Sequence, residues 1–580
     1  MKPRHETTPI SLLIVLAFLL VTGAAGTAQA QQVQVTAAVP SSTAQGTINL
    51  NVKVTGKGFK NGAKAKWFVT GSTDPGGVQV NSTTFVSSTE VTANITVADT
   101  AVTANFDIQV LNSDGRGGKG TELFAVTAKG GGNATCPALQ PAPTSDTKCY
   151  AALPGCLDST FGGVGFVHTD ATSAYVSSAD QAKGVAVQPD GKIVVTGQVR
   201  ISSTDIDFAV IRYNIDGSPD TSFGDPVPLN PPLRRGYTLT PITTGFDYAY
   251  ALALQPDGRI VVTGAADGGR DSVVVRYNLD GTLDSTFASG GIAHFGGSAP
   301  RSDVALQEDG KIVVAGQGGF GLMRLNSNGS LDSGFGSGGM VSVNASGSRK
   351  GSSLALALAI QRVPAITGEE RVVVVGWSRL SSTSNQEWTL MRFRSNGATD
   401  ASFGGGGIVR TYFSGFGDQA RRVRIDSSNR IAVAGLVRTY SDSCGSYIID
   451  SGVVRYNQDG TLDGTFGGGK QIVDVYGGDD SLYGLALQPD GKILISEVAR
   501  SSDNAATYFG LIRFNPDGTL DPTFGPMANG VVTTDLYGTE SWAFGGVAVQ
   551  PTDGKIVVAG SAYLGPNFTD SQIVVARYWP

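Results

Sequence analysis

The architecture of most of this chain is indicated by one stretch, Gln188-Pro189-Asp190-Gly191-Lys192-Ile193-Val194-Val195. It contains a tight turn followed by the start of a strand. Proline suits the first corner of a type I turn, aspartate the second, and glycine the left-handed position that follows. The apolar run after the turn has no polar face, which is typical of a strand covered on both sides. The stretch therefore predicts a hairpin in a sheet with two buried faces.

This stretch returns along the chain together with two other signatures. It begins again at Gln255, Gln307, Gln488 and Gln550, with weaker copies near Gln361 and Asp426. The second signature, Leu157-Asp158-Ser159-Thr160-Phe161-Gly162, returns at spacings of 48 to 68 residues around Asp220, Asp284, Asp332, Asp400, Asp463 and Asp521. The third, Ile211-Arg212-Tyr213-Asn214, is echoed at Arg276, Arg324, Arg392, Arg455, Arg513 and Arg577. Seven copies of one unit indicate a repeat architecture.

Each repeat predicts four strands. The repeat region opens with an outer strand at residues 165–169 and ends with a third strand at residues 573–578. Pairing these two strands would complete the last unit and remove the exposed sheet edges. The sequence therefore predicts an all-β fold over residues 157–580, a seven-bladed β-propeller closed by its N-terminal outer strand. The alternative is a solenoid, which would need terminal caps, and none is evident.

Residues 1–30 have the features of a cleaved signal peptide. Lys2 and Arg4 precede an apolar run from Ile10 to Val21, and Ala28-Gln29-Ala30 fits a cleavage site. The run is too short to span a bilayer, so we expect a secreted, periplasmic or cell-surface protein without a transmembrane segment. Removing two basic residues and one acidic residue leaves 41 basic and 48 acidic residues. This net charge of −7 argues against nucleic acid as a partner.

Residues 31–129 show a different pattern, of short strands in which apolar and polar residues alternate, as from Ile48 to Val54. This pattern predicts a β-sandwich. The segment 130–156 is rich in cysteine and proline and is expected to be a linker. The pairing of the four cysteines stays open among Cys136, Cys149, Cys156 and Cys444. No Cys-x-x-Cys spacing supports a zinc site.

Both regions resemble known families. Residues 31–129 resemble the immunoglobulin-like IPT/TIG family through the stretches 54–59, 87–92 and 110–115, which implies a spacer or interaction module; a β-sandwich of another lineage is the alternative. Residues 157–580 resemble the bacterial delta-60 repeat family through the three signatures above, with the strand order of NHL-type propellers. This resemblance implies an exported propeller and no established reaction.

Two sets of residues are candidates for ligand binding. Acidic residues eight positions before the end of the innermost strand could form a partial ring at the channel mouth, or could cap turns instead. They are Asp180, Asp247, Asp418 and Asp480. Aromatic residues in the variable loops of one face could anchor a ligand or pack those loops. They are Trp377, Trp388, Tyr440, Tyr447 and Tyr563.

Histidine is scarce, which limits the catalytic chemistry that can be expected. After signal cleavage only His168 and His294 remain, so the sequence offers almost no histidines for a Ser-His-Asp site or a polyhistidine metal site. We expect a non-catalytic exported binding or scaffold protein, without cofactor or metal ion, that presents a propeller face to a protein or polysaccharide. The alternative is a carbohydrate-active hydrolase or lyase that uses paired carboxylates near the central channel, such as Asp247 and Asp480.

Overall fold

The protein is all-β in its computed structural model, which describes residues 32–44, 50–98, 100–127, 153–171, 180–228, 233–297, 303–316, 319–347, 352–363, 369–381, 385–413, 417–441, 446–501, 505–537, 540–563 and 571–580. Within these ranges there is no α-helix, and the two short 3₁₀ helices are η1 (Asp267–Gly269) and η2 (Gly467–Gly469). No described helix is long and apolar enough to cross a membrane. The chain forms two compact units, within residues 1–134 and 135–580. The predicted signal peptide and most of the predicted linker lie outside the described residues.

The first unit contains two four-stranded sheets, in the orders β1–β3–β6–β5 and β2–β8–β7–β4. Their strands are β1 (Gln34–Val39), β2 (Ser42–Ala44), β3 (Leu50–Lys57), β4 (Lys64–Val69), β5 (Val78–Ser87), β6 (Glu90–Val97), β7 (Ala104–Leu111) and β8 (Gly117–Thr127). Buried and half-buried side chains alternate along β6, because successive residues of a strand face opposite sides. The core includes Trp67 and Phe124, whose rings meet edge to face at 5.9 Å.

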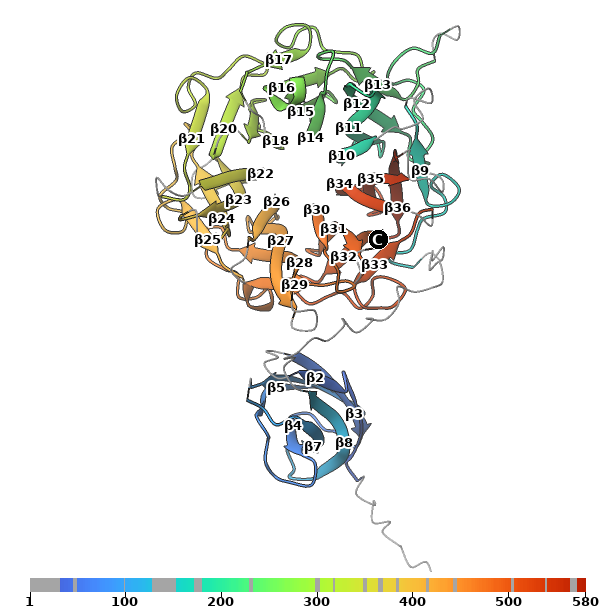
Figure 1. The fold of residues 1–580 in the computed structure, drawn as a ribbon, viewed down its shortest axis with the longest axis vertical. Coiled ribbons are helices and arrows are strands. Elements are labelled where there is room, and N and C mark those ends of the chain that lie inside the picture. The colour runs from blue at the N-terminus through green and yellow to red at the C-terminus, as the bar shows by residue number, and fades with distance from the viewer. Residues whose placement is uncertain are drawn as a thin grey trace, which may run out of the picture. The chain divides into compact units, whose positions relative to one another are not determined.

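The second unit contains seven four-stranded antiparallel sheets among its described residues, arranged around a central space (Figure 1). The innermost strands are β10 (Gln181–Val187), β14 (Tyr248–Leu254), β18 (Asp303–Leu306), β22 (Ser352–Arg362), β26 (Gln419–Ile425), β30 (Ser481–Leu487) and β34 (Ser541–Val549). The second strands are β11 (Ile193–Ser202), β15 (Ile260–Ala266), β19 (Ile312–Ala315), β23 (Glu370–Arg379), β27 (Ile431–Ser441), β31 (Ile493–Arg500) and β35 (Ile556–Tyr563).

The two outer positions of each sheet complete this arrangement. The third strands are β12 (Asp205–Tyr213), β16 (Asp271–Tyr277), β20 (Phe320–Leu325), β24 (Glu387–Phe393), β28 (Ser446–Tyr456), β32 (Thr507–Phe514) and β36 (Ser571–Tyr578). The outermost strands are β13 (Tyr237–Thr240), β17 (Ile292–His294), β21 (Met340–Val343), β25 (Ile408–Thr411), β29 (Lys470–Val473), β33 (Val531–Thr534) and β9 (Phe166–Thr169). The first of these strands in the chain, β9, pairs with the last, β36, with Thr169 opposite Ile573.

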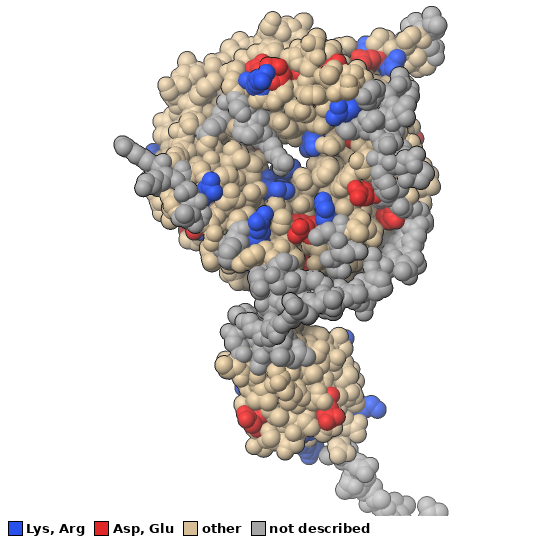
Figure 2. All heavy atoms as spheres, viewed as in Figure 1, with Lys and Arg blue, Asp and Glu red and all other residues tan. Residues whose placement is uncertain are grey.

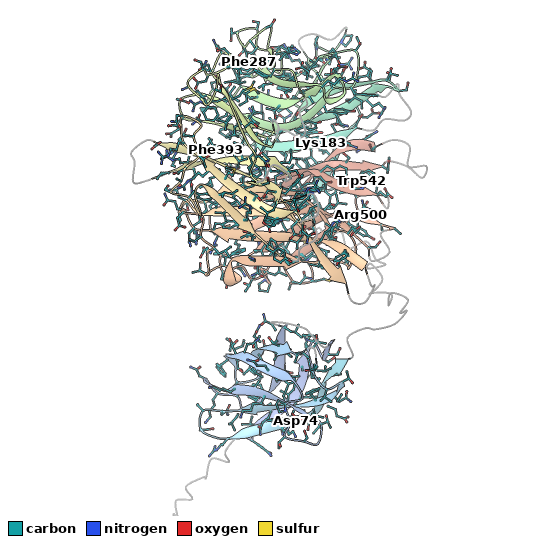
Figure 3. The ribbon with its side chains drawn as sticks, turned by 60° about the vertical axis from the view of Figure 1, so that its left-hand side comes forward. Asp74, Lys183, Phe287, Phe393, Arg500 and Trp542 are labelled. Atoms are coloured by element: carbon teal, nitrogen blue, oxygen red, sulfur yellow. The ribbon has the colours of Figure 1, made fainter. Side chains whose placement is uncertain are left out.

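Hydrophobic side chains join neighbouring sheets all the way round (Figure 3). One cluster places Val557 and Ile573 of the last sheet against Ile193 and Ile211 of the first. The apolar runs of the repeat are therefore buried on both faces, as their composition predicts.

The arginine, aspartate and phenylalanine of the repeated signatures contact one another in a buried cluster. In the first sheet the Nε of Arg212 donates to the Oδ2 of Asp220 at 2.7 Å, and the guanidinium lies 4.4 Å from the ring centroid of Phe223. The Nη1 of Arg212 also donates to the carbonyl of Leu279 in the next sheet at 2.6 Å. The aspartate of the Leu-Asp-x-Thr-Phe signature is thus a structural ion-pair partner, and the arginine links one sheet to the next.

Cys156 is buried and disulfide-bonded. The other three cysteines lie outside the described residues, so the pairing stays open.

Candidate functional site

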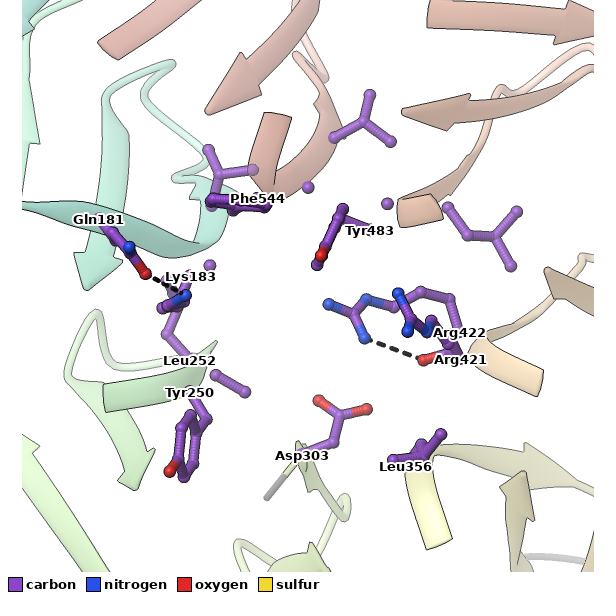
Figure 4. Close-up of a pocket in the computed structure, with 18 of the residues that line it drawn as sticks. Gln181, Lys183, Tyr250, Leu252, Asp303, Leu356, Arg421, Arg422, Tyr483 and Phe544 are labelled. Atoms are coloured by element: carbon purple, nitrogen blue, oxygen red, sulfur yellow. Dashed lines mark hydrogen bonds between the residues drawn. The ribbon is translucent and has the colours of Figure 1, made fainter. Parts of the chain in front are cut away.

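One variable position of the repeat faces the middle of the ring. It lies five residues before the glutamine or aspartate that follows the innermost strand, or six in β34, where one residue is inserted. The residues at this position are Lys183, Tyr250, Leu356, Arg421, Tyr483 and Phe544. All of them line a central cavity of about 470 Å³, into which Figure 4 shows their side chains pointing.

Basic side chains outnumber acidic ones in the described lining of this cavity. The basic residues are Lys183, Arg421, Arg422 and Arg424, and the acidic residue is Asp303. Figure 2 shows basic side chains bordering the central opening. Because a cleft lined by charges of one sign focuses the electric field, this cavity attracts anions.

Aromatic rings hold two of these cations at the cavity wall. The Nζ of Lys183 lies 5.1 Å from the ring centroid of Phe544. The guanidinium of Arg421 lies 5.5 Å from the ring centroid of Tyr483, and its Nη1 donates to the carbonyl of Leu482 at 3.3 Å. A cation over an aromatic face is attracted by the ring quadrupole, so these contacts help to position both charges at the cavity wall.

A row of aromatic rings runs outward from the cavity. The rings of Tyr483 and Phe544 meet at 4.8 Å with an interplanar angle of 71°. Phe544 stacks on Trp542 at 5.8 Å, and Trp542 meets Tyr563 at 4.9 Å. Among the five predicted aromatic residues, Tyr563 is therefore linked to the cavity through two intervening rings.

Asp303 contributes the carboxylate of the described lining, and both of its oxygens accept backbone hydrogen bonds. Oδ1 accepts from the N–H of Val304 and Oδ2 from the N–H of Leu358, each at 3.0 Å. The second bond ties β18 to β22 of the next sheet. Asp303 thus has a structural role in addition to its place in the cavity.

The four predicted aspartates are fully buried and do not line this cavity. In each case Oδ1 accepts the backbone N–H of the residue twenty positions later, at 3.0 to 3.2 Å. The pairs are Asp180 with Arg200, Asp247 with Asp267, Asp418 with Arg438, and Asp480 with Arg500. This repeated bond fits the turn-capping alternative, because it fastens the segment before the innermost strand to the end of the second strand or the residue after it. The described lining of the central cavity includes four basic residues and none of these four acids.

The other predicted aromatic residues are not gathered into one loop face. Trp377 and Trp388, expected in one loop, lie opposite each other on β23 and β24. Trp388 is buried, and its Nε1 donates to the carbonyl of Leu436 at 2.9 Å. Tyr440 and Tyr447, also expected in a variable loop, pair with each other on the extended ends of β27 and β28. Tyr447 is exposed, whereas the side chain of Tyr440 lies outside the described part.

The cavity residues escaped the sequence analysis because they differ from repeat to repeat. Repeated motifs drew attention to the turns, whereas Lys183, Tyr250 and Arg421 occupy the same position with unrelated side chains. Aligning the repeats on the glutamine that follows the innermost strand would have exposed this variable position.

Several solved structures have a similar fold. A polysaccharide lyase, Uly1, aligns with a TM-score of 0.39 and 10% identity over 77% of this chain and 98% of its own. The α-L-arabinofuranosidase Arb93A from Fusarium graminearum aligns with a TM-score of 0.34 and 10% identity over 69% and 97%. The extracellular domains 1–2 of Drosophila Semaphorin 1b align with a TM-score of 0.35 and 10% identity over 71% and 86%. No curated protein matches the chain.

The prediction that this protein is not an enzyme is contradicted by this comparison, because a polysaccharide lyase and glycosidases are among the similar structures. We therefore do not retain it. At about 10% identity the likeness itself concerns the fold alone.

Six segments of the chain match one family model, described as "Domain of unknown function (DUF5122) beta-propeller". They are residues 188–223, 255–287, 307–335, 371–403, 427–466 and 488–524. Each begins within or near the turn before a second strand and ends at the phenylalanine of the Thr-Phe-Gly signature or its equivalent. The chain therefore carries the repeats of a β-propeller repeat family.

Proposed function

We propose that this protein is an exported, carbohydrate-active β-propeller that binds an anionic polysaccharide in its central cavity. The observation that carries this proposal is the combination of four basic side chains and several aromatic rings in one cavity. Arginine pairs with carboxylate or sulfate groups through two parallel hydrogen bonds. Aromatic faces suit the apolar C–H faces of sugar rings, since both are flat and weakly hydrated.

The remainder of the architecture supports this role. The seven sheets would be the blades of a seven-bladed propeller closed by β9, of the delta-60 type. The first unit would be an immunoglobulin-like module of the IPT/TIG type that acts as a spacer, and residues 1–30 would direct export. A rigid ring of sheets is suited to hold the cavity residues, which come from all seven sheets, in fixed positions.

Elimination is the cleavage chemistry for which this cavity has suitable groups. A two-carboxylate glycosidase needs two acids flanking the scissile bond, and the described lining of this cavity contains one acidic residue, Asp303. Arg421 and Tyr483, by contrast, lie side by side. In a uronate chain Arg421 would neutralise the carboxylate, and Tyr483, deprotonated to the phenolate beside this cation, would take the proton from C5. The C4–O bond would break, a C4=C5 double bond would form, and the leaving oxygen would be protonated from water or a second cavity group.

Calorimetric titration with polygalacturonate, a sulfated glycan and a neutral glucan tests the binding proposal. We expect the anionic polymers to bind and the neutral one not to bind. Arg421→Gln should weaken binding by about tenfold or more, because it removes a charge-assisted hydrogen bond. Arg270→Gln, at an exposed arginine directly after η1, is the control and should leave affinity unchanged. Equal binding of the neutral glucan, or unchanged affinity of Arg421→Gln, would sink the proposal.

Cleavage is tested separately, by the ultraviolet absorbance of the unsaturated product. Tyr483→Phe should abolish product formation and retain binding, since it removes only the hydroxyl group. New reducing ends without ultraviolet absorbance would indicate hydrolysis and contradict elimination. Binding without any product would leave a binding function alone.

A further inference from the structure

Three aspartates come together between the fifth and sixth sheets, outside the described lining of the central cavity. Asp450 lies on β28, Asp474 follows β29, and Asp480 precedes β30. One carboxylate oxygen from each lies within 4.8 Å of the others. Two oxygens bound to one Ca²⁺ ion at about 2.4 Å can be at most about 4.8 Å apart, so the three acids have the spacing of a cation site.

A fourth carboxylate faces this group from β31. Glu497 is fully buried, and neither of its oxygens has a hydrogen-bond partner of normal geometry. Burial raises the pKa of Glu497 well above its ordinary value, and the charges of all three aspartates raise it further, whereas the nearby hydroxyl of Ser451 lowers it. A buried carboxylate without a partner costs several kcal/mol, which a bound cation would offset.

The repeat shows that the fold itself does not require this glutamate. The equivalent position in the other six units is glycine: Gly197, Gly264, Gly316, Gly376, Gly435 and Gly560. Most of these sites have no room for a side chain; a Cβ at Gly435, for example, would lie 2.0 Å from the carbonyl oxygen of Gln419. In the sixth sheet Gly510 lies opposite Glu497, and a Cβ on Gly510 would lie 2.7 Å from the Cγ of Glu497. The sixth unit thus differs from the others in the acid, and the glycine opposite it leaves space for the side chain.

We propose that the carboxylate cluster of Asp450, Asp474, Asp480 and Glu497 binds one Ca²⁺ ion, which the three aspartates contact directly, and that this ion fastens the fifth sheet to the sixth. Ligands that are all oxygen select a hard cation, and the irregular arrangement suits Ca²⁺ better than Mg²⁺, which demands octahedral geometry. The exposed Asp474 provides access from solvent, and the buried members provide the negative charge. The ion would be structural, since no member of the cluster lines the central cavity.

The test uses the full chain, freed of metal by EDTA and dialysis. Calorimetric titration with CaCl₂ should show one site, and thermal unfolding should shift to higher temperature with Ca²⁺ and less with Mg²⁺. Glu497→Gln keeps the size of the side chain and removes its charge, and it should weaken Ca²⁺ binding by at least about tenfold.

Asp180→Asn is the matched control. Asp180 makes the same 3.0 Å bond to Arg200 as Asp480 makes to Arg500, but glycine stands in place of the glutamate in its sheet. This variant should unfold more readily and still bind Ca²⁺ as the wild type does.

Glu497→Gly, which introduces the residue of the other six units, should bind no Ca²⁺ and should be more stable than the wild type in EDTA. This variant also tests the proposal if Glu497→Gln does not fold. A wild type that neither binds Ca²⁺ nor gains stability from it would overturn the proposal, as would undiminished Ca²⁺ binding by either Glu497 variant.

Discussion

Arg577 on β36 joins the two ends of the ring of sheets, and its replacement by methionine tests whether the ring is closed. Its Nε donates to the Oδ2 of Asp158 at 2.7 Å, and its Nη2 donates to the hydroxyl of Thr160 at 3.0 Å. The guanidinium also lies 4.7 Å from the ring centroid of Phe161. The side chains of Arg577 and Asp158 are 2% and 0% exposed, although the two residues are 419 positions apart.

Removing Arg577 leaves Asp158 with a single cationic partner, Lys555, whose Nζ lies 3.0 Å from its Oδ2. The loss is therefore that of a buried hydrogen bond between charged groups, about 2–3 kcal/mol. Arg577→Met keeps most of the apolar length of the side chain, so the loss should come from the ion pair. Arg455→Met is the matched control, because the Nε of Arg455 donates to Asp463 at 2.7 Å in the equivalent ion pair of the fifth sheet. Asp463 likewise keeps a second cation, Arg430, at 3.5 Å. We expect both variants to lower the free energy of unfolding by about 2–3 kcal/mol, measured by urea denaturation.

The comparison between the two variants decides the matter. If Arg577→Met costs less than about 0.5 kcal/mol, as an ordinary surface substitution does, while Arg455→Met costs several, the pairing of β9 with the last sheet is refuted. Limited proteolysis gives a second readout. If the ring is closed in the wild type and loosened in Arg577→Met, the protease should cleave near residues 157–170 faster in the variant than in the wild type.

Three further substitutions test local features. Gly435→Ala should destabilise the protein by about 1–3 kcal/mol in urea denaturation, because its Cβ would lie 2.0 Å from the carbonyl oxygen of Gln419. Burial alone would raise the pKa of Asp107, but hydrogen bonds from Lys119 and three other donors outweigh it and lower the pKa to about 2. The first unit should therefore lose stability as the pH falls from about 4 to about 2, and thermal unfolding of Asp107→Asn should lack this loss. Burial and two neighbouring carboxylates raise the pKa of Asp207 to about 7. Asp207 therefore holds its proton more tightly in the folded protein than in the unfolded chain, and its ionisation destabilises the fold. Asp207→Asn should raise the melting temperature above pH 7 and have little effect at pH 4.

Much of the fold could be predicted from the sequence because its signals are local. The Pro-Asp-Gly turn and the apolar run after it specify a hairpin within about ten residues, and their recurrence identifies the repeat. Even the pairing of β9 with β36 follows from counting strands, since the repeat region begins with an outer strand and ends with a third one. The extensions of β27 and β28 were missed, because Tyr440 and Tyr447 stand in a stretch without regular alternation.

The sequence by itself determined the all-β repeat, because turns and strands depend on neighbouring residues. Only the tertiary structure decided what the ring holds. The central cavity takes side chains from all seven sheets, so its lining cannot be assembled from any one repeat, and Lys183 and Arg421 become neighbours of one space only when the ring closes. The carboxylate cluster likewise draws its acids from β28, β31 and the segments beside β29 and β30. Charges that are far apart in the chain interact only when folding brings them within a few ångströms, and no local pattern records that distance.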